Sequence, residues 1–239
     1  MADTAQFVQE TYGEANDYYP DEVPANESRM ACLFLLDNSI SMYGESIRSL
    51  NGGMNRFKVD VCKDEQTRKV LDVAVISFND KFKIEQDWTG IENMANIDLQ
   101  ASGGTLMTPA IKAGLTKVDE RYRYYMRNGA QPYKPWIVMV SDGGENANVN
   151  EVSAIIKDME AQEKLNFISL GVDGYDANIL TQLSGSKVIR LVGHDFTSFF
   201  DWVAKSFRAV SNKAPGANVP LAPMPPNLQP GYKKSWFDN

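Results

Sequence analysis

Residues 32–41 read CLFLLDNSIS, an unbroken apolar run that gives way within one residue to polar side chains. Such a run, without the alternation of a half-exposed strand, is typical of a strand buried by helices on both faces. Open α/β sheets bind their ligands in the crevice beyond the carboxyl ends of such strands. Asp37, Ser39 and Ser41 stand at that point and offer oxygen donors, the ligand type of a hard cation such as Mg²⁺. Because Mg²⁺ requires near-octahedral coordination, we expect other loops to supply further oxygens.

The rest of the chain alternates between strand and helix patterns. Runs rich in β-branched residues predict strands, and apolar residues spaced three and four apart predict helices. The expected strands are 32–36, 70–78, 82–88, 136–140, 167–172 and 187–192, and the expected helices are 44–61, 108–126, 149–162, 177–183 and 196–210. This alternation predicts an α/β fold with a doubly wound, mostly parallel six-stranded sheet and helices on both faces. The polar alternation of 82–88 makes it the one expected antiparallel edge strand.

Composition indicates one domain with two unusual ends. A chain of 239 residues with 43% hydrophobic residues can bury one large core, which we place at residues 30–211. Residues 1–29 form an acidic, turn-rich arm, and residues 1–30 together carry seven acidic side chains against one arginine. Residues 212–239 form a proline-rich tail, because six prolines fall within sixteen residues. We expect a flexible or surface-draped tail, with docking of Trp236 and Phe237 on a partner or on the domain as the alternative.

Several classes of function are disfavoured by composition. Lys and Arg form no cluster of the kind that tracks nucleic-acid phosphates. The sequence shows neither a secretory signal layout nor an apolar run of membrane-spanning length, so we expect a cytoplasmic protein without membrane contact. Cys32 and Cys62 are interpreted as core residues rather than a disulfide. His194, the only histidine, excludes zinc sites built on several histidines, makes a Ser-His-Asp triad improbable, and is interpreted as a loop residue.

Two other loops offer the missing oxygens. Asp142 follows the buried strand 136–140, and Thr105 ends the glycine-containing loop ASGGT before helix 108–126. If strands 32–36 and 136–140 are neighbours, the oxygen-bearing side chains of these loops converge at one point. These are Asp37, Ser39, Ser41, Thr105 and Asp142. The alternative is that both aspartates merely cap loops, because Asp and Ser are common in turns and at helix starts.

In this order the five residues resemble the metal-ion-dependent adhesion site of the von Willebrand factor A family, an Asp-x-Ser-x-Ser motif with a distant Thr and a distant Asp. The resemblance covers about residues 30 to 210. The segments 36–39, 102–105 and 134–143 are similar, more narrowly, to the bacterial tellurite-resistance (TerY-type) stand-alone A domains. One departure is Ile40, where these proteins usually carry Gly; a β-branched residue restricts that turn to negative φ.

The resemblance implies a metal-dependent protein-interaction module rather than an enzyme. It implies that Ser39, Ser41 and either Thr105 or Asp142 touch a Mg²⁺ ion, with Mn²⁺ or Ca²⁺ as alternatives, and that the remaining carboxylate acts through water. An Asp or Glu of a partner protein would fill the open position, for example in a bacterial or phage stress-response assembly. Exchange of the metal bond between Thr105 and Asp142 would accompany movement of the last helix, residues 196–210.

Two other functions stay open. One is a magnesium-dependent hydrolase or phosphotransferase with Asp37 as nucleophile, although the phosphate-binding glycine motifs of such enzymes are missing from the sequence. The other is a structural subunit whose tails mediate self-assembly and whose metal only stabilises the fold. The oligomeric state is not indicated by the sequence.

Overall fold

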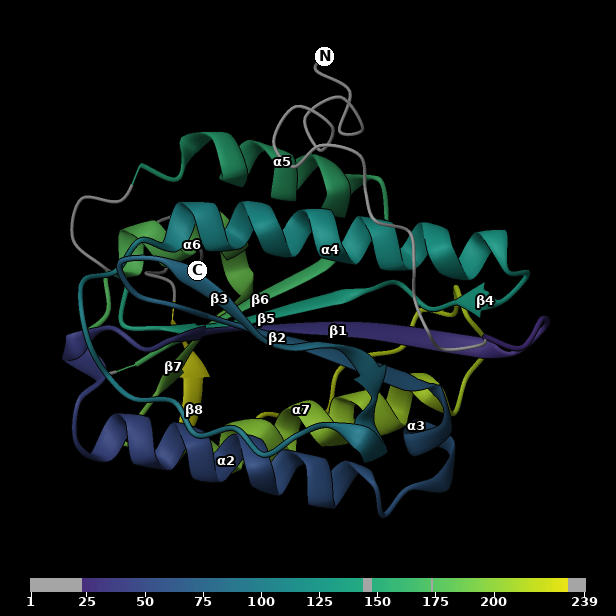
Figure 1. Ribbon diagram of the computed structural model, residues 1–239, viewed down its shortest axis with the longest axis horizontal. Helices are drawn as coiled ribbons and strands as arrows, with labels where there is room; N and C mark the ends of the chain where they lie inside the picture. Colours follow the sequence, from purple (N-terminus) through teal and green to yellow (C-terminus); the bar gives the residue numbers. More distant parts are fainter. Residues whose placement is uncertain (1–22, 144–147, 173, 232–239) are drawn as a thin grey trace, which may run out of the picture.

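The computed structural model describes residues 23–143, 148–172 and 174–231, whose strands form one eight-stranded sheet (Figure 1). The strand order is β3-β2-β1-β5-β6-β7-β8, and β4 pairs with the beginning of β1. The strands are β1 Ser28–Asp37, β2 Leu71–Phe78, β3 Phe82–Gly90, β4 Gln131–Pro132, β5 Trp136–Ser141, β6 Asn166–Gly171, β7 Val188–Leu191 and β8 Leu228–Pro230. Six strands, β1, β2, β4, β5, β6 and β7, pair with one another in parallel. The two edge strands are antiparallel: β3 pairs with β2, and β8 pairs with β7.

The sheet reverses its winding direction between β1 and β5. From β1 the chain moves to β2 and β3 on one side, and then crosses to β5, β6 and β7 on the other side. β1 pairs in parallel with both β2 and β5, so it lies at the centre of the sheet. In a doubly wound sheet this switch point is where a crevice opens beyond the carboxyl ends of the strands.

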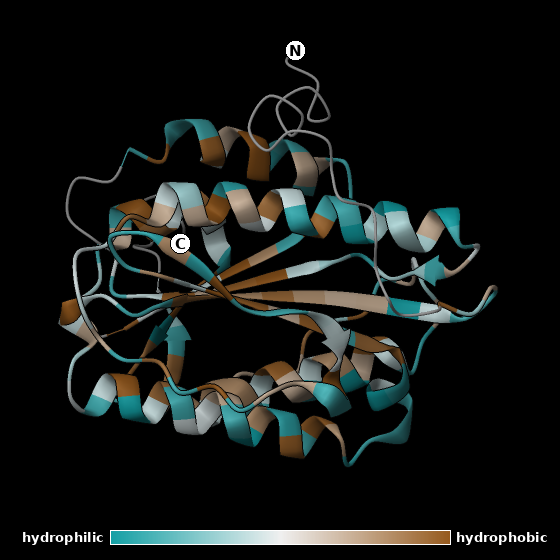
Figure 2. Ribbon diagram, viewed as in Figure 1, coloured by the Kyte–Doolittle hydropathy of each residue, from teal (hydrophilic) through white to brown (hydrophobic). Residues whose placement is uncertain are grey.

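Helices cover both faces of the sheet, as Figure 1 shows. Each layer packs apolar side chains on the sheet and forms its own core cluster. One face carries α2 Glu45–Val61, α3 Glu65–Val70 and α7 Phe196–Ser211, and the other carries α4 Met107–Arg127, α5 Asn150–Ala161 and α6 Ala177–Ser184. Three short 3₁₀ helices, η1 Ile40–Met42, η2 Ile91–Asn93 and η3 Gly185–Lys187, lie in the connections. Figure 2 shows mostly hydrophobic colours in the central strands and both colours in the helices.

The predicted fold class is confirmed, but the predicted six strands with one antiparallel edge are wrong. The sheet has two additional short strands, and the second antiparallel strand, β8, forms the other edge. β8 comes from the proline-rich tail, where proline density argued against regular structure. Pro230 is tolerated because an edge strand needs ladder bonds on one side only. The pairing is closed by Gly231, whose N–H donates to the Val188 carbonyl at 2.8 Å.

The described part of the tail, residues 212–231, packs on the domain. Trp202 of α7 donates its indole N–H to the Ala222 carbonyl at 2.7 Å. Tyr175 donates its hydroxyl to the Gly231 carbonyl, also at 2.7 Å. These contacts make residues 212–231 a strap over α7 and the sheet edge, which is the surface-draped form of the expected tail. The alternative concerning Trp236 and Phe237 falls on residues outside the described part of the chain.

At the other end, residues just before 30 also pair and pack with the domain. β1 starts at Ser28, which pairs with Gln131 of β4, and Val23 is 8% exposed within the α4 layer. The remainder of the acidic arm, residues 1–22, lies outside the described residues. Within the described ranges, no helix combines the length and the apolar character needed to cross a bilayer.

A buried polar cluster ties α4 to the sheet. Arg121 is 1% exposed, and its Nη2 lies 2.8 Å from Asp72 Oδ2 on β2. Tyr125 donates its hydroxyl to the same oxygen at 2.5 Å, and burial is the main cause that raises the pKa of this phenol well above its usual range. Removing one partner of a buried ion pair strongly destabilises a fold, so this cluster fixes the position of α4 on the sheet. The first turn of α4 follows the Thr105 loop.

Candidate metal centre

The two predicted aspartates end neighbouring strands at the switch point. Asp37 is the last residue of β1, and Asp142 follows β5 directly. In the parallel register Leu36 lies opposite Val140, so the two strands end at the same level. Asp37 is fully buried and Asp142 is half-buried. The crevice expected from the sequence therefore has a carboxylate on each side.

The loop after β1 folds back on the Asp37 carboxylate through Ser39. The backbone N–H of Ser39 donates to Asp37 Oδ1 at 2.8 Å, and the hydroxyl oxygens of Ser39 and Ser41 are 2.9 Å apart. Ile40 starts the 3₁₀ turn η1 and its φ is not positive, so a β-branched residue fits there without strain. The departure at Ile40 consequently leaves the backbone geometry of the motif intact.

A side chain that the sequence analysis did not assign to the site holds the other carboxylate oxygen. Ser141 donates its hydroxyl to Asp37 Oδ2 at 2.6 Å and accepts the Gly143 N–H at 2.8 Å. It thereby ties the ends of β1 and β5 together. The sequence shows that Ser141 stands at a strand end just before Asp142. Its bond to Asp37 cannot be read from the sequence, because that bond depends on β5 being the neighbour of β1.

The Thr105 loop lies against the loop after β1. Gly103 accepts the Ile40 N–H at 3.0 Å, and Ser102 donates its N–H to the Asn38 carbonyl at 2.9 Å. The side-chain amide of Asn38 donates to the Gln100 carbonyl at 3.0 Å. These bonds pair residues 102–103 with residues 38–40, so the loop that ends at the half-buried Thr105 runs alongside the loop that carries the two serines.

Asp80, in the turn between β2 and β3, supports the same loop from outside. Its Oδ1 accepts the Gly104 N–H at 2.7 Å. Gly103 has a φ of +69°, and a Cβ at this position would lie 2.2 Å from Asp80 Oδ2. Only glycine therefore fits here, for both conformational and steric reasons. In the sequence the Asn79-Asp80 pair is typical of a turn between two strands and carries no signal for this second role.

The segment after β5 is fixed by a second tight glycine. The Asp176 N–H donates to the Asp142 carbonyl at 3.1 Å. Gly143 has a φ of +73°, and a Cβ there would lie 3.0 Å from the Asp176 nitrogen. These contacts determine where the Asp142 backbone leaves the sheet. The sequence predicts Glu145 and Asn146 as residues at the edge of the site rather than as ligands, and both lie outside the described residues.

The electrostatics of the pair fit a bound cation. Burial raises the pKa of Asp37 from its ordinary 3.8 to about 6; hydrogen bonds from Ser141 and Ser39 lower it, and the charge of Asp142 raises it. No Lys or Arg within the described part of the chain pairs with this carboxylate. A buried carboxylate next to a second one, without a basic partner, is unfavourable unless a cation compensates the charge.

The donor set decides which kind of ion fits. Among the described residues, no three His, Cys, Asp or Glu side chains gather into a metal-binding group. The candidate centre instead combines two carboxylates with the hydroxyls of Ser39, Ser41 and Thr105. Such hard oxygen donors suit Mg²⁺, Mn²⁺ or Ca²⁺ and are a poor match for ions that select thiolates or imidazoles.

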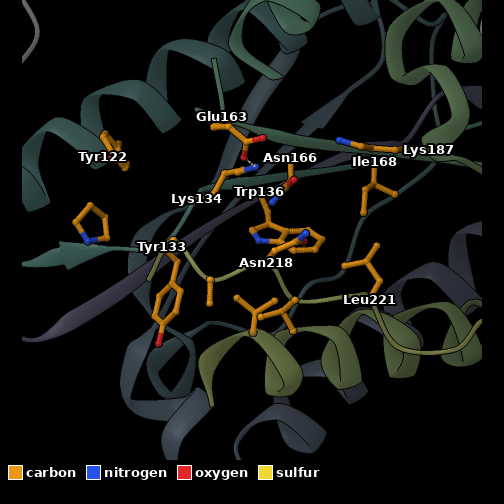
Figure 3. Close-up of a pocket in the computed structure, with 15 residues that line it drawn as sticks. Tyr122, Tyr133, Lys134, Trp136, Glu163, Asn166, Ile168, Lys187, Asn218 and Leu221 are labelled. Carbon is orange, nitrogen blue, oxygen red and sulfur yellow. Dashed lines mark hydrogen bonds and ion pairs between the residues drawn. The ribbon is translucent and has the colours of Figure 1, made fainter. Parts of the chain in front are cut away.

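A cavity lies elsewhere, at the other end of the sheet. A pocket of about 700 Å³ opens near the amino ends of β5 and β6, between the sheet and the tail segment around Asn218 and Leu221 (Figure 3). Its charged lining is already paired, because Lys134 contacts Glu163. This pocket is at the opposite end of the strands from Asp37 and Asp142 and contributes nothing to the candidate centre.

The fold and the site define a class, the doubly wound α/β domain with an oxygen-lined crevice at its switch point. The sequence model of the von Willebrand factor type A domain matches residues 32–202, more than half of the chain. The chain belongs to the von Willebrand factor type A domain family.

Solved structures of low sequence identity share this fold. The vWF domain of the type V pili tip protein Mfa5 from Porphyromonas gingivalis has a TM-score of 0.55 and 11% identity, covering 81% of this chain and 99% of that one. For the pilus adhesin SpaC from Lactobacillus rhamnosus GG the TM-score is 0.57 and the identity 11%, and the match covers 77% of this chain and 30% of that one. For proximal thread matrix protein 1 from the mussel byssus the TM-score is 0.53 and the identity 15%, and the match covers 77% of this chain and 49% of that one. This chain thus spans half or less of the latter two proteins. None of the curated proteins matches the chain.

Proposed function

We propose that this chain is a metal-dependent protein-interaction module whose divalent cation is held by Asp37, Ser39, Ser41, Thr105 and Asp142. The observation that carries the proposal is the fully buried Asp37 carboxylate beside Asp142, with hydroxyl oxygens around it and no basic side chain among the described residues to balance it. Membership of the von Willebrand factor type A family supports it, because domains of this family commonly bind proteins through a metal ion. Mg²⁺ is the ion we propose, with Mn²⁺ and Ca²⁺ as substitutes that accept the same donors.

The residues of the centre have distinct tasks. Asp37 is fixed from both sides, by the Ser39 N–H and the Ser141 hydroxyl, so its charge is held in one place. Ser39 and Ser41 present their hydroxyls from a short turn, and Thr105 and Asp142 approach from the two other loops. When bound, the cation supplies a positive centre at an otherwise acidic edge of the sheet, which allows a partner to dock through an Asp or Glu side chain.

The setting of this interaction is the narrower part of the proposal. The motifs at 36–39, 102–105 and 134–143 are similar to those of TerY-type proteins, and we propose on that basis a partner in a bacterial or phage stress-response assembly. A partner pull-down with the full chain tests it. We expect prey to be retained in Mg²⁺ and lost both in EDTA and with Asp37→Ala.

Metal binding itself is tested by titration calorimetry on the full chain with Mg²⁺ and Mn²⁺. Ser41→Ala is the informative variant, because Ser41 is exposed and its hydroxyl can be removed with little effect on packing. Ser198→Ala, which removes an exposed hydroxyl that bonds only within the α7 cap, is the matched control. Binding that is weakened by the first change and unaffected by the second is expected. Absence of any divalent binding to the parent chain would overturn the proposal.

A change in the position of α7 on partner binding belongs to the same proposal. In this structure α7 packs on α2, and the tail holds it through Trp202 and through Ser206, whose hydroxyl accepts the Ala222 N–H at 3.2 Å. Movement of α7 would have to carry or break this strap. Hydrogen exchange in α7, compared with and without Mg²⁺ and an acidic peptide, tests it; unchanged exchange contradicts the movement.

The geometry does not favour Asp37 as a nucleophile. Its carboxylate is fully buried, and each oxygen already accepts a hydrogen bond. A nucleophile has to reach the substrate, and these bonds hold the side chain away from the surface. Phosphatase activity that is present in the parent and lost in Asp37→Ala would reinstate the enzyme. The structural-subunit alternative is tested by light scattering: an assembly whose size differs between Mg²⁺ and EDTA would support it.

A further inference from the structure

Large exposed apolar side chains stand close in sequence to the hydroxyl donors of the candidate metal centre. Ile40 is 60% exposed, Tyr43 is 76% exposed and Leu106 is 49% exposed. They come from the two loops that carry the hydroxyl donors: Tyr43 bonds back to Ile40 in the turn η1, and Leu106 follows Thr105. We call these three side chains the apolar rim. Exposed apolar groups gathered around one functional point mark a contact surface.

The rim and the centre together specify the chemistry of an occupant. A carboxylate is needed for the cation, and aromatic or aliphatic side chains close to it are needed for the rim. Residues 1–22 of this chain have that composition: six acidic residues, no Lys or Arg, and four aromatic residues. Glu10 in particular lies between Phe7 and Tyr12.

The length of the chain excludes the acidic residues that lie too close to Val23 to reach the centre. α4 has 21 residues, so it spans about 32 Å at about 1.5 Å per residue. It begins next to the rim and ends near the start of the domain, where the Asn26 N–H donates to the Gly129 carbonyl at 2.9 Å. Figure 1 shows η1 and the start of β1 at opposite ends of the molecule.

From Val23, which is buried in the α4 layer, an extended chain covers about 3.3 Å per residue. Glu10 can therefore lie up to about 43 Å away, which exceeds the length of α4. Asp17 can lie only about 20 Å away and falls short of the centre. Glu10 and Asp17 have the same charge and similar aromatic neighbours, so the distance that the chain can span from Val23 is what distinguishes them.

We propose that the segment around Glu10 docks on the metal centre of its own chain, with the Glu10 carboxylate toward the cation and Phe7 and Tyr12 on the apolar rim. The proposal rests on the proposed function, because it needs a bound cation. A segment on the same chain is present at high effective concentration. It therefore competes with an outside partner, whose apparent affinity falls by the fraction of chains that are self-occupied.

Paramagnetic broadening in the full-length chain tests this docking. Mn²⁺ takes the same donors as Mg²⁺, and its unpaired electrons broaden the amide signals of nearby residues. With ¹⁵N-labelled chain we expect Mn²⁺, compared with Mg²⁺, to remove the signals of residues 7–12 and to leave those of residues 17–22 in place. Glu10→Gln should restore the lost signals. Asp17→Asn, the matched control, should leave the pattern as in the parent, and Tyr43→Ser should weaken it.

Calorimetry of Mn²⁺ on the same labelled chain separates the possible failures. If Mn²⁺ does not bind, the proposed function and this inference both fall. If Mn²⁺ binds and the signals of residues 7–12 persist, only this inference is overturned. Mixing labelled Asp37→Asn chain with unlabelled, Mn²⁺-loaded parent tests docking between copies: broadening in the labelled arm would show that the occupant is a second copy and would overturn docking within one chain.

Discussion

The substitution Asp37→Asn should stabilise the metal-free protein at neutral pH and abolish its response to metal. In the metal-free fold the ionised carboxylate is buried without a basic partner among the described residues, so its charge opposes folding. Asparagine keeps the shape and removes the charge. A residue whose removal improves the bare fold but ends cation binding is one retained for function.

The magnitude follows from the pKa of Asp37, which burial raises from 3.8 to about 6. At about 1.36 kcal/mol per pKa unit, this opposes folding by about 3 kcal/mol above pH 6. Asn offers one carbonyl oxygen where the carboxylate accepts bonds from Ser39 and Ser141, so one donor is left unpaired, at a cost of about 1 to 3 kcal/mol. The expected net gain for Asp37→Asn in EDTA at pH 8 is therefore about 0 to 2 kcal/mol.

The pH dependence of the free energy of unfolding shows whether the Asp37 charge opposes folding, whatever the net effect of the substitution is. Because the folded-state pKa of Asp37 lies above its unfolded value, the folded chain holds the extra proton between pH 3.8 and about 6. The free energy of unfolding of the parent must fall, relative to that of Asp37→Asn, as pH rises through this interval, and then level off. Subtracting the variant from the parent removes the titration of all other groups.

Urea denaturation of both proteins from pH 4 to pH 8, in EDTA and in Mg²⁺, measures these differences. In Mg²⁺ at pH 8 the parent should gain stability with ion concentration, as expected for a ligand of the folded state, while Asp37→Asn gains none. The reasoning is refuted if the metal-free parent becomes more stable than the variant as pH rises from 4 to 7, because the carboxylate would then be favoured by its surroundings.

Three further substitutions test the support of the centre and of α4. Ser141→Ala removes a hydrogen bond that lowers the pKa of the buried carboxylate, so calorimetry should show weaker Mg²⁺ binding, with the largest loss near pH 6. Gly103→Ala forces a side chain into an occupied, positive-φ position and should destabilise the fold by about 1 to 3 kcal/mol in urea and weaken Mg²⁺ binding. Its control, Gly52→Ala, meets no atom within 4 Å in α2 and should leave Mg²⁺ binding unchanged. Arg121→Met removes the nearer of two arginines at the buried Asp72 carboxylate, the other being Arg29, whose Nη1 lies 3.8 Å from Asp72 Oδ1. It should lower the free energy of unfolding by up to about 5 kcal/mol in denaturant titrations; a loss below about 1 kcal/mol would show that the Arg121–Asp72 pair is not a structural tie.

The central strands could be predicted from sequence because their environment leaves a local signal. β1 and β5 are covered on both faces, so nearly every residue in them is apolar, and each run ends abruptly at an aspartate. β4 and β8 leave no such signal. They contain two and three residues, and they are strands only because the first residues of β1 and the edge of β7 lie beside them.

The same distinction separates the candidate ligands from their supports. Asp37 and Asp142 could be predicted because a carboxylate right after a buried strand stands out, whatever the rest of the fold is. Ser141 and Asp80 could not, because their roles depend on which strand lies next to β1 and on the β2–β3 turn lying over the Thr105 loop. Sequence patterns thus locate groups at strand ends, while the hydrogen bonds that fix them depend on tertiary neighbours.

Ile40 shows how a difference in the motif can change its meaning once the backbone is known. In the sequence, a β-branched residue in place of glycine predicts only that the backbone of this turn is restricted to negative φ. In the structure Ile40 begins a 3₁₀ turn at a φ that any residue adopts, and its N–H still bonds to Gly103. Because the side chain is 60% exposed beside the candidate centre, its effect falls on the surface that a carboxylate-bearing segment must approach. The residue therefore bears on what binds at the centre rather than on how the centre is built.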